Sequence, residues 1–250
     1  MSLYDKASLV MIPSGYKDDK LFSIKPTDGS GDFTFSRDGA GASPATRVNA
    51  SGLIEKGREN LALQSNQFDT TWTPSNASVT GGQTGYDGSS DAWLLSKSAA
   101  YGSVYQTSIA VSYPAVYTFS VYMKAGTQNF GSIRFWTNNT GADFRVKFDL
   151  TTGAISTASA NNGTRIDAVA TDVGSGWWRV SVTGLTGQTS ATLNIYAGDT
   201  ADASGTIYIQ SAQLEQGLIA TDYIATTTAA VSAGLLGDMP RLDYSGGAVS

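Results

Sequence analysis

Short segments in which apolar and polar residues alternate recur along this chain from about residue 92 to residue 214. In one of them, Phe144, Val146 and Phe148 are separated by single charged residues. This alternation matches the two-residue period of a β-strand with one buried face. Short strands at regular spacing are typical of a sandwich or jelly roll. The segments with this character are 92–95, 103–110, 115–124, 130–137, 143–150, 165–170, 177–184, 190–197 and 206–214.

Turn sequences rich in Gly, Asn and Asp separate these segments. Two of the intervals are short enough for hairpins. We predict one hairpin over Phe144–Ile155, with its turn at Thr151-Thr152-Gly153, and another over Trp177–Tyr196, with its turn within 184–188.

The last alternating segment contains a change of phase. Ile207 and Ile209 would point to one side of a regular strand, and Ala212 and Leu214 to the other. The change falls near Gln210 and Ser211. It predicts either a β-bulge or a strand that changes its buried side.

The chain divides into three parts by character. Residues 1–58 have no Trp and only short apolar clusters between turn sequences. Such a segment could be disordered or could be an extended arm that orders against another surface, and the apolar clusters favour the arm. Residues 59–225 carry the alternating segments and are predicted to form the sandwich. Residues 226–250 lose the alternation and are predicted to be an exit arm. The predicted fold is therefore an all-β jelly-roll sandwich flanked by extended N- and C-terminal arms.

Composition excludes several classes of function. The 250 residues include no Cys and no His, which removes disulfides, thiol catalysis and the Ser-His-Asp triad. The net charge is −5, and residues 59–250 hold 8 Lys and Arg against 14 Asp and Glu. An acidic domain repels phosphates, so we expect no nucleic acid as a partner. No apolar run is long enough to span a membrane.

Alternation also sorts the strand residues into two sets. The apolar set predicts the core: Phe119, Val121, Met123, Ile133, Phe135, Phe144, Val146, Phe148, Leu150, Trp178, Val180, Val182, Leu193 and Ile195. The other set mixes aromatic rings with Arg and Lys, which an ordinary solvent-facing surface would not. We interpret it as one face that is occupied by a ligand or a partner. The candidate site residues are Tyr122, Arg134, Trp136, Arg145, Asp149, Trp177, Arg179, Asn194 and Tyr196.

Two interpretations of this face stay open. Aromatic rings beside Arg, Asn and Asp suit a glycan, because rings pack on the apolar side of a sugar and polar groups bind its hydroxyls. Trp and Arg are also enriched at protein interfaces, so a loop or a neighbouring subunit could cover the face.

Catalysis is not expected. A glycosidase needs two carboxylates that flank the scissile bond. Most acids here lie in predicted turns, and Asp149 is the sole acid among the candidate residues, so we assign no catalytic residue. No metal site or cofactor is predicted. A structural calcium ion could use carboxylates such as Asp87, Asp91 and Glu215, but no ligand-spacing motif supports it.

Several stretches resemble structural proteins of tailed bacteriophages. In the first part of the chain they are Ser2–Gly15, Gly31–Arg37, Ala45–Asn49, Gly52–Leu61, Gln64–Phe68 and Trp72. An Arg-x-Asn-Leu sequence, here Arg58 to Leu61, often precedes a jelly roll similar to carbohydrate-binding modules in such appendage proteins. Further matching stretches are Gly176–Arg179, Ser211–Gly217, Ala220–Ile224 and Pro240–Tyr244.

The resemblance implies a non-enzymatic virion protein, such as a tail or head fibre or a capsid-attached protein. The arm would dock to the particle, and the jelly roll would project from it. The implied partners are other virion proteins and further copies of the chain, with a trimer as the expected assembly. A host surface glycan is the alternative partner, and the implied location is the virion.

Overall fold

The computed structural model describes residues 3–17, 20–34, 47–48, 54–55, 58–137, 142–198 and 201–233. The chain divides into two compact units. One comprises Met1–Arg58 with Ser232–Ser250, and the other comprises Glu59–Val231. The functional division into an attachment arm, a sandwich and an exit arm stays a prediction. No helix in the described ranges is long and apolar enough to cross a membrane.

The first unit contains a small antiparallel sheet with the strand order β1-β2-β3. Asp32 braces it, because its carboxylate accepts hydrogen bonds from the Ser23 backbone N–H at 2.8 Å and from the Ser23 hydroxyl at 3.0 Å. A short pair, β4 and β5, follows. The element bounds are α1 (Leu3–Lys6), β1 (Val10–Lys17), β2 (Lys20–Lys25), β3 (Phe33–Thr34), β4 (Arg47–Val48) and β5 (Ile54–Glu55).

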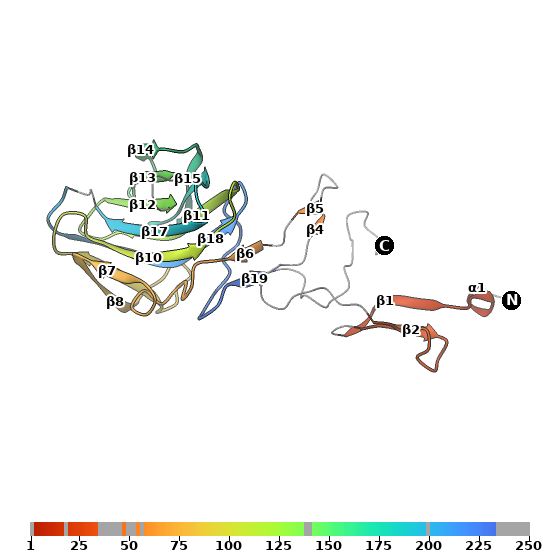
Figure 1. Ribbon diagram of the computed structural model, residues 1–250. Coiled ribbons are helices and arrows are strands. Elements are labelled where there is room, and N and C mark those ends of the chain that lie inside the picture. Colours follow the sequence, from red (N-terminus) through yellow and green to blue (C-terminus); the bar gives the residue numbers. More distant parts are fainter. Residues whose placement is uncertain are drawn as a thin grey trace. The chain divides into compact units, whose positions relative to one another are not determined.

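The second unit is a sandwich of two six-stranded antiparallel sheets (Figure 1), which confirms the predicted all-β jelly roll. The first sheet has the order β14 (Ile155–Asn161), β13 (Asp143–Asp149), β12 (Phe130–Thr137), β17 (Ser190–Ala197), β10 (Ser103–Ala110), β7 (Thr73–Ser75). The second sheet has the order β15 (Arg165–Gly174), β16 (Trp177–Leu185), β11 (Val116–Ala125), β18 (Gly205–Gln216), β9 (Ala92–Lys97), β8 (Ala77–Gln83). Two short strands, β6 (Arg58–Asn60) and β19 (Val231–Ala233), pair with each other.

The core lies between the two sheets and contains the residues that the alternation predicts. All of the predicted core residues are buried except Trp178, which is half-buried and packs against the core. The indole N–H of Trp178 donates a hydrogen bond to the Leu150 carbonyl at 2.9 Å. Burial of this apolar set is the main stabilising contribution to the sandwich.

One predicted hairpin is confirmed and the other is wrong. β13 and β14 pair around the Thr151-Thr152-Gly153 turn. Gly153 has a φ of +74°, and a Cβ there would lie 2.2 Å from the Trp178 ring, so the turn requires glycine. β16 and β17 do not pair, because they belong to different sheets. The chain between them crosses from one sheet to the other, and alternation within each strand carries no signal of that crossing.

The change of phase in the closing strand β18 is a β-bulge. The register against β11 shifts between the pairs Ser120↔Gln213 and Tyr122↔Gln210, and Ser211 in the bulge has a φ of +55°. The bulge restores the apolar phase, so the Ile and Leu side chains on both sides of it are buried in the same core.

Beyond the bulge, β18 is joined to the segment that enters the sandwich through the buried side chain of Asn60. Its amide nitrogen donates to the carbonyls of Ala212 (3.1 Å) and Ile224 (2.8 Å). Its Oδ1 accepts from the N–H groups of Ala62 and Leu214, both at 3.0 Å. The Asn of the Arg-x-Asn-Leu sequence therefore connects the entering segment, the closing strand and the leaving segment.

The Gln-Leu-Glu sequence at the end of β18 has a similar structural role. The Gln213 side chain accepts from the Ile224 N–H at 2.7 Å, and its amide nitrogen donates to Glu215 Oε1 at 2.7 Å. Glu215 in turn accepts from the N–H of Thr221 at 2.8 Å and from its hydroxyl at 2.6 Å. We call these residues, together with Asn60, the terminal clasp, because they hold the two ends of the sandwich side by side.

Candidate functional site

The outer side of the first sheet carries a row of polar and aromatic residues across four strands. Arg134 on β12 lies opposite Arg145 on β13 and opposite Asn194 on β17. Asn194 in turn lies opposite Tyr105 on β10. Their strand neighbours Ile133 and Phe135 are fully buried in the core, so alternation directs this row outward.

Two further aromatic residues flank the row. Trp136 lies two residues beyond Arg134 on β12 and is half-buried. Tyr196 lies two residues beyond Asn194 on β17 and is buried. We define the polar-aromatic face as Tyr105, Arg134, Trp136, Arg145, Asn194 and Tyr196.

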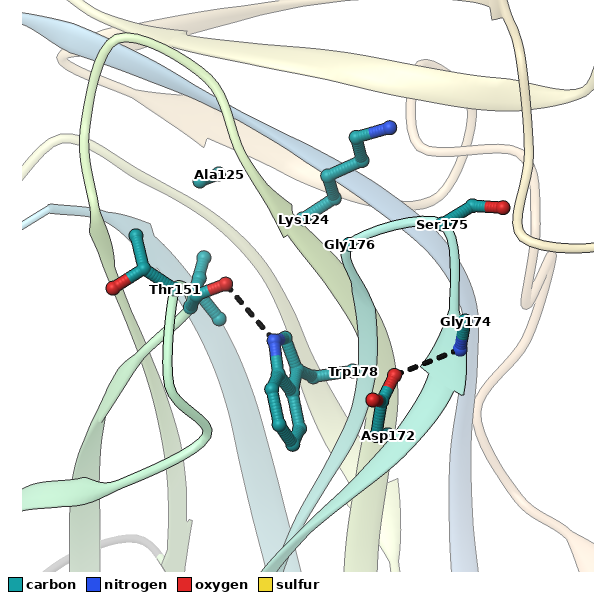
Figure 2. Close-up of a pocket in the computed structure, with 9 residues that line it drawn as sticks. Lys124, Ala125, Thr151, Asp172, Gly174, Ser175, Gly176 and Trp178 are labelled. Atoms are coloured by element: carbon teal, nitrogen blue, oxygen red, sulfur yellow. Dashed lines mark hydrogen bonds between the residues drawn. The ribbon is translucent and has the colours of Figure 1, made fainter.

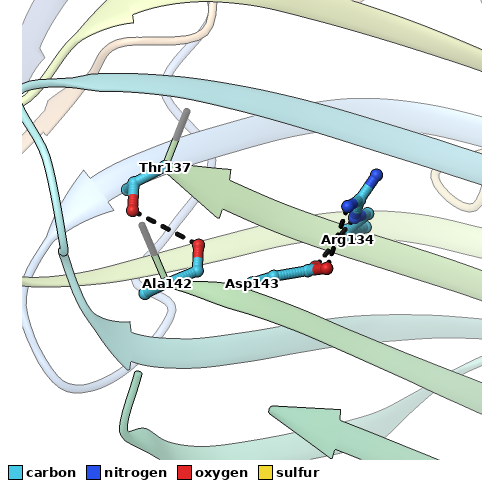
Figure 3. Close-up of polar contacts among 4 residues, drawn as sticks. All are labelled: Arg134, Thr137, Ala142 and Asp143. Atoms are coloured by element: carbon cyan, nitrogen blue, oxygen red, sulfur yellow. Dashed lines mark hydrogen bonds and ion pairs between the residues drawn. The ribbon is translucent and has the colours of Figure 1, made fainter. Parts of the chain in front are cut away.

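Arg134 forms an ion pair with Asp143. Its Nε and Nη2 atoms donate to the two carboxylate oxygens at 2.7 and 2.8 Å (Figure 3), with side-chain exposures of 21% for Arg134 and 18% for Asp143. The hydrogen bond to Asp143 raises the pKa of Arg134. The guanidinium also lies 4.7 Å from the centre of the Trp136 ring. The pair fixes Arg134 so that it supports Trp136.

Near this pair, β12 and β13 are also tied at their ends. The hydroxyl of Thr137 donates to the Ala142 carbonyl at 3.2 Å (Figure 3), and the Thr137 N–H donates to the same carbonyl at 2.8 Å. This contact holds the strand ends that carry Trp136 and Asp143 in a fixed register.

Arg145 and Asn194 differ from Arg134 because each has a covered polar atom without a partner within the described chain. The Arg145 guanidinium lies 5.2 Å from the centre of the Tyr196 ring, and its Nε is covered without an acceptor. The Asn194 side-chain oxygen is also covered without a donor, and the residue is only 9% exposed. Unpaired polar groups of this kind typically cost about 1–3 kcal/mol each.

The structure does not bring the nine predicted site residues together on one face, and the prediction of a single face is wrong. Arg134, Trp136, Arg145, Asn194 and Tyr196 lie on the outer side of the first sheet. Another three, Tyr122, Trp177 and Arg179, lie on the outer side of the second sheet. Alternation separates inward from outward residues but does not assign a strand to a sheet.

The outer side of the second sheet is filled by packing within the chain. Trp177 is 1% exposed and clusters with Ala92 and Tyr122. The Tyr122 ring stacks on Tyr86 with ring centres 3.8 Å apart. Burial raises the pKa of Tyr86. Trp177 is therefore inaccessible to a ligand.

Arg179 lies beside this cluster, with its guanidinium 5.3 Å from the Tyr122 ring centre. It donates to the Ser120 hydroxyl at 3.3 Å. A pocket of about 350 Å³ lies next to it, bounded partly by the exposed side chains of Leu218 and Ile219.

Asp149 has a turn role rather than a place in the middle of the sheet. It ends β13, and its Oδ1 accepts from the N–H of Thr151 at 2.8 Å and from the Thr151 hydroxyl at 2.6 Å. The hydrogen bond from that hydroxyl lowers the pKa of Asp149. The acid that contacts the polar-aromatic face is Asp143, through Arg134. The sequence analysis missed it although it shares the phase of Arg145 on the same strand.

The sequence analysis also missed Tyr105 and Tyr86, for which the sequence signals are weaker. Tyr105 has the same alternation phase as polar residues of its strand, so this pattern could have placed it on the outer side of the sheet. Tyr86 lies in a loop, where no period exists to predict its stacking on Tyr122.

The three carboxylates considered for calcium do not meet. Asp87 and Asp91 both accept hydrogen bonds from the Ser89 hydroxyl, whereas Glu215 belongs to the terminal clasp. Among the described residues, no group of three or more His, Cys, Asp or Glu side chains could hold a metal ion.

A second pocket, of about 370 Å³, lies where the β13–β14 turn approaches the β15–β16 turn (Figure 2). Two of the polar groups that line it are bound within the chain. The Trp178 indole N–H donates to Leu150, and Asp172 accepts from the Gly174 N–H at 2.8 Å. We take the polar-aromatic face as the candidate site, because it combines a half-buried Trp ring with covered polar atoms that lack partners.

No protein-family profile matches this chain, and no curated protein matches it in sequence. The solved structures that it resembles include the CBM22-1 xylan-binding domain of Paenibacillus barcinonensis Xyn10C. That match has 14% identity and a TM-score of 0.39, and it covers 72% of this chain and 100% of the other. TmCBM61 in complex with β-1,4-galactotriose matches at 12% identity and a TM-score of 0.31, over 63% of this chain and 99% of the other.

A bacteriophage chain is also among the similar structures. The enzymatically active domain of bacteriophage CBA120 tailspike protein 4 matches at 18% identity and a TM-score of 0.38. The match covers 63% of this chain and 21% of the tailspike chain. The chain thus spans about a fifth of the length of that tailspike domain.

Proposed function

We propose that the sandwich is a glycan-binding module and that the polar-aromatic face contacts the sugar chain. The observation that carries this proposal is the combination of a half-buried Trp136 with two polar atoms that lack partners, Arg145 Nε and Asn194 Oδ1, on one side of one sheet. Aromatic rings pack against the apolar side of a sugar, and Arg and Asn bind its hydroxyl groups. We infer that the chain acts by binding rather than by catalysis.

The rigidity of this face also supports the proposal. The row from Arg145 to Tyr105 is carried by adjacent hydrogen-bonded strands, and Arg134 is fixed by Asp143. A site built on strands loses little conformational entropy when it binds, which favours recognition of a flexible polysaccharide.

We expect Trp136→Ala to weaken glycan binding about tenfold or more, because removal of a central aromatic contact typically costs more than about 1 kcal/mol. Binding of the full chain should be measured on a glycan array and then by calorimetry with the best ligand. Trp136→Phe keeps a ring and should retain most of the affinity. Leu218→Ala, which removes an exposed side chain from the second sheet's side, should leave binding unchanged.

A protein interface would give a different result from a glycan site. If the wild-type chain binds nothing on a broad glycan array and instead self-associates through this face, the face is a protein interface. In that case Trp136→Ala would change the sedimentation behaviour rather than glycan binding.

A second candidate function is a structural part of a bacteriophage virion, with a homotrimer and other virion proteins as its partners. It is supported by the resemblance of the arm sequences to structural proteins of tailed bacteriophages. The assignment of residues 1–58, outside the sandwich, to a separate compact unit also favours it.

For this second function, deletion of residues 1–58 should leave a folded β domain that no longer joins particles. Circular dichroism would report the fold, and immunoblots of purified particles would report incorporation. Incorporation at the wild-type level would remove the attachment role from residues 1–58.

A further inference from the structure

We propose that the glycan recognised by the polar-aromatic face is acidic, and that Arg145 binds a carboxylate group of its sugars. This inference rests on the proposed glycan-binding function. It starts from the register of β12 and β13, which places Arg145 directly opposite Arg134. Like charges at directly opposite positions of a sheet repel each other.

Only one member of this pair is neutralised by the protein. Arg134 has the carboxylate of Asp143 at 2.7 and 2.8 Å, whereas Arg145 forms no ion pair with any described residue. Asp143 lies on the same strand as Arg145 but has both of its oxygens directed at Arg134 (Figure 3). An anionic group from outside the chain would remove the repulsion that remains.

The position of the Arg145 guanidinium suits it to this role. It lies 5.2 Å from the centre of the Tyr196 ring, and its covered Nε has no acceptor. The residue is half-buried, so part of it is exposed at the surface. A planar guanidinium matches the geometry of a carboxylate, which it binds through two parallel hydrogen bonds.

The carboxylates nearest to Arg145 along β13 are already bound elsewhere. Asp143, Arg145, Lys147 and Asp149 share one side of this strand. The Asp143 carboxylate accepts from Arg134, and the Asp149 carboxylate accepts from Thr151 in the turn. Neither acid is therefore directed at Arg145.

Trp136 indicates that the ligand is longer than one sugar. It lies on β12, the strand beside Arg145, directly opposite Asp143, and its ring is half-buried. Neighbouring strands are roughly 5 Å apart, and Asp143 lies two residues from Arg145 on the same side of β13. The face therefore fits an oligosaccharide whose carboxylate reaches Arg145 while a neighbouring ring packs on Trp136.

The test compares polysaccharides that differ only in charge. Binding of the full chain should be measured with uronate polysaccharides such as polygalacturonate and alginate, with the methyl-esterified form of polygalacturonate, and with dextran sulfate and dextran. We expect at least tenfold tighter binding to a uronate polysaccharide than to its ester, and this preference should weaken as salt is added. Arg145→Gln should abolish the preference. Lys124→Gln removes one positive charge from the second sheet's outer side, so it should preserve the preference.

Two outcomes would show that the inference is wrong. In one, the wild-type chain binds neutral and acidic glycans equally. In the other, Lys124→Gln lowers uronate binding as much as Arg145→Gln does. Stronger binding of dextran sulfate than of every uronate polysaccharide would overturn the carboxylate assignment. Binding of neutral glycans that depends on Trp136 but not on Arg145 would retain the glycan-binding function and reject the acidic ligand. Binding of no glycan at all would reject both.

Discussion

Replacement of Asn60 by alanine is expected to lower the free energy of unfolding of the sandwich by about 3–5 kcal/mol. The side chain is fully buried and makes four hydrogen bonds to backbone groups. Alanine leaves two backbone N–H groups and two carbonyls without these partners. Each buried polar group that loses its partner typically costs about 1–3 kcal/mol, although relaxation of the segments recovers part of the loss.

Chemical denaturation of the full chain would measure this effect, with Asn161→Ala as the matched control. Asn161 is exposed on β14, and its replacement should change the free energy of unfolding by less than about 0.5 kcal/mol. An unfolding free energy of Asn60→Ala equal to that of the control would show that the terminal clasp does not stabilise the sandwich.

The other large effect is expected at Trp177. Trp177→Ala should destabilise the sandwich by about 3–5 kcal/mol, because the indole is 1% exposed and packs with Ala92 and Tyr122. The cavity left behind would also leave the stacked Tyr86–Tyr122 pair without support on one side. Thermal melts followed by circular dichroism would measure the loss.

Trp136→Ala is the matched comparison, since it removes the same side chain from a half-buried position. It should destabilise the sandwich by less than about 1.5 kcal/mol while weakening glycan binding. If Trp177→Ala melted at the wild-type temperature but no longer bound glycan, the second sheet, and not the first, would carry the site.

Alternation predicted the strands that have one apolar side, and buried and half-buried residues alternate along the whole of β13. The core residues of β11, β16 and β17 also follow it, but most residues of the opposite phase in these strands are buried as well. It did not predict β8, whose sequence Ala-Ser-Val-Thr-Gly-Gly-Gln is polar and rich in glycine. β8 is an edge strand in which half-buried residues alternate with exposed ones, so it contributes little apolar surface to the core. The bulge at Ser211 could be predicted because it interrupts a period that is otherwise regular.

The candidate site was predicted residue by residue but not as a surface. The outward directions of Arg145 and Asn194 follow from the period of their strands. The separation of Trp177 from Trp136 follows from sheet order, which depends on contacts between segments that are distant in the sequence. The period of a segment shows which of its residues lie on each side of a strand. It does not show which strand is its neighbour in the sheet.

The terminal clasp also has a mechanical consequence. Because Asn60 bonds at the same time to the entering segment, to β18 and to the leaving segment, a force that pulls residues 60 and 224 apart is resisted first by these hydrogen bonds. The force is then transmitted between the entering and leaving segments through the clasp, and not through the core between the two sheets. The polar-aromatic face would then keep its geometry under tension until the clasp ruptures.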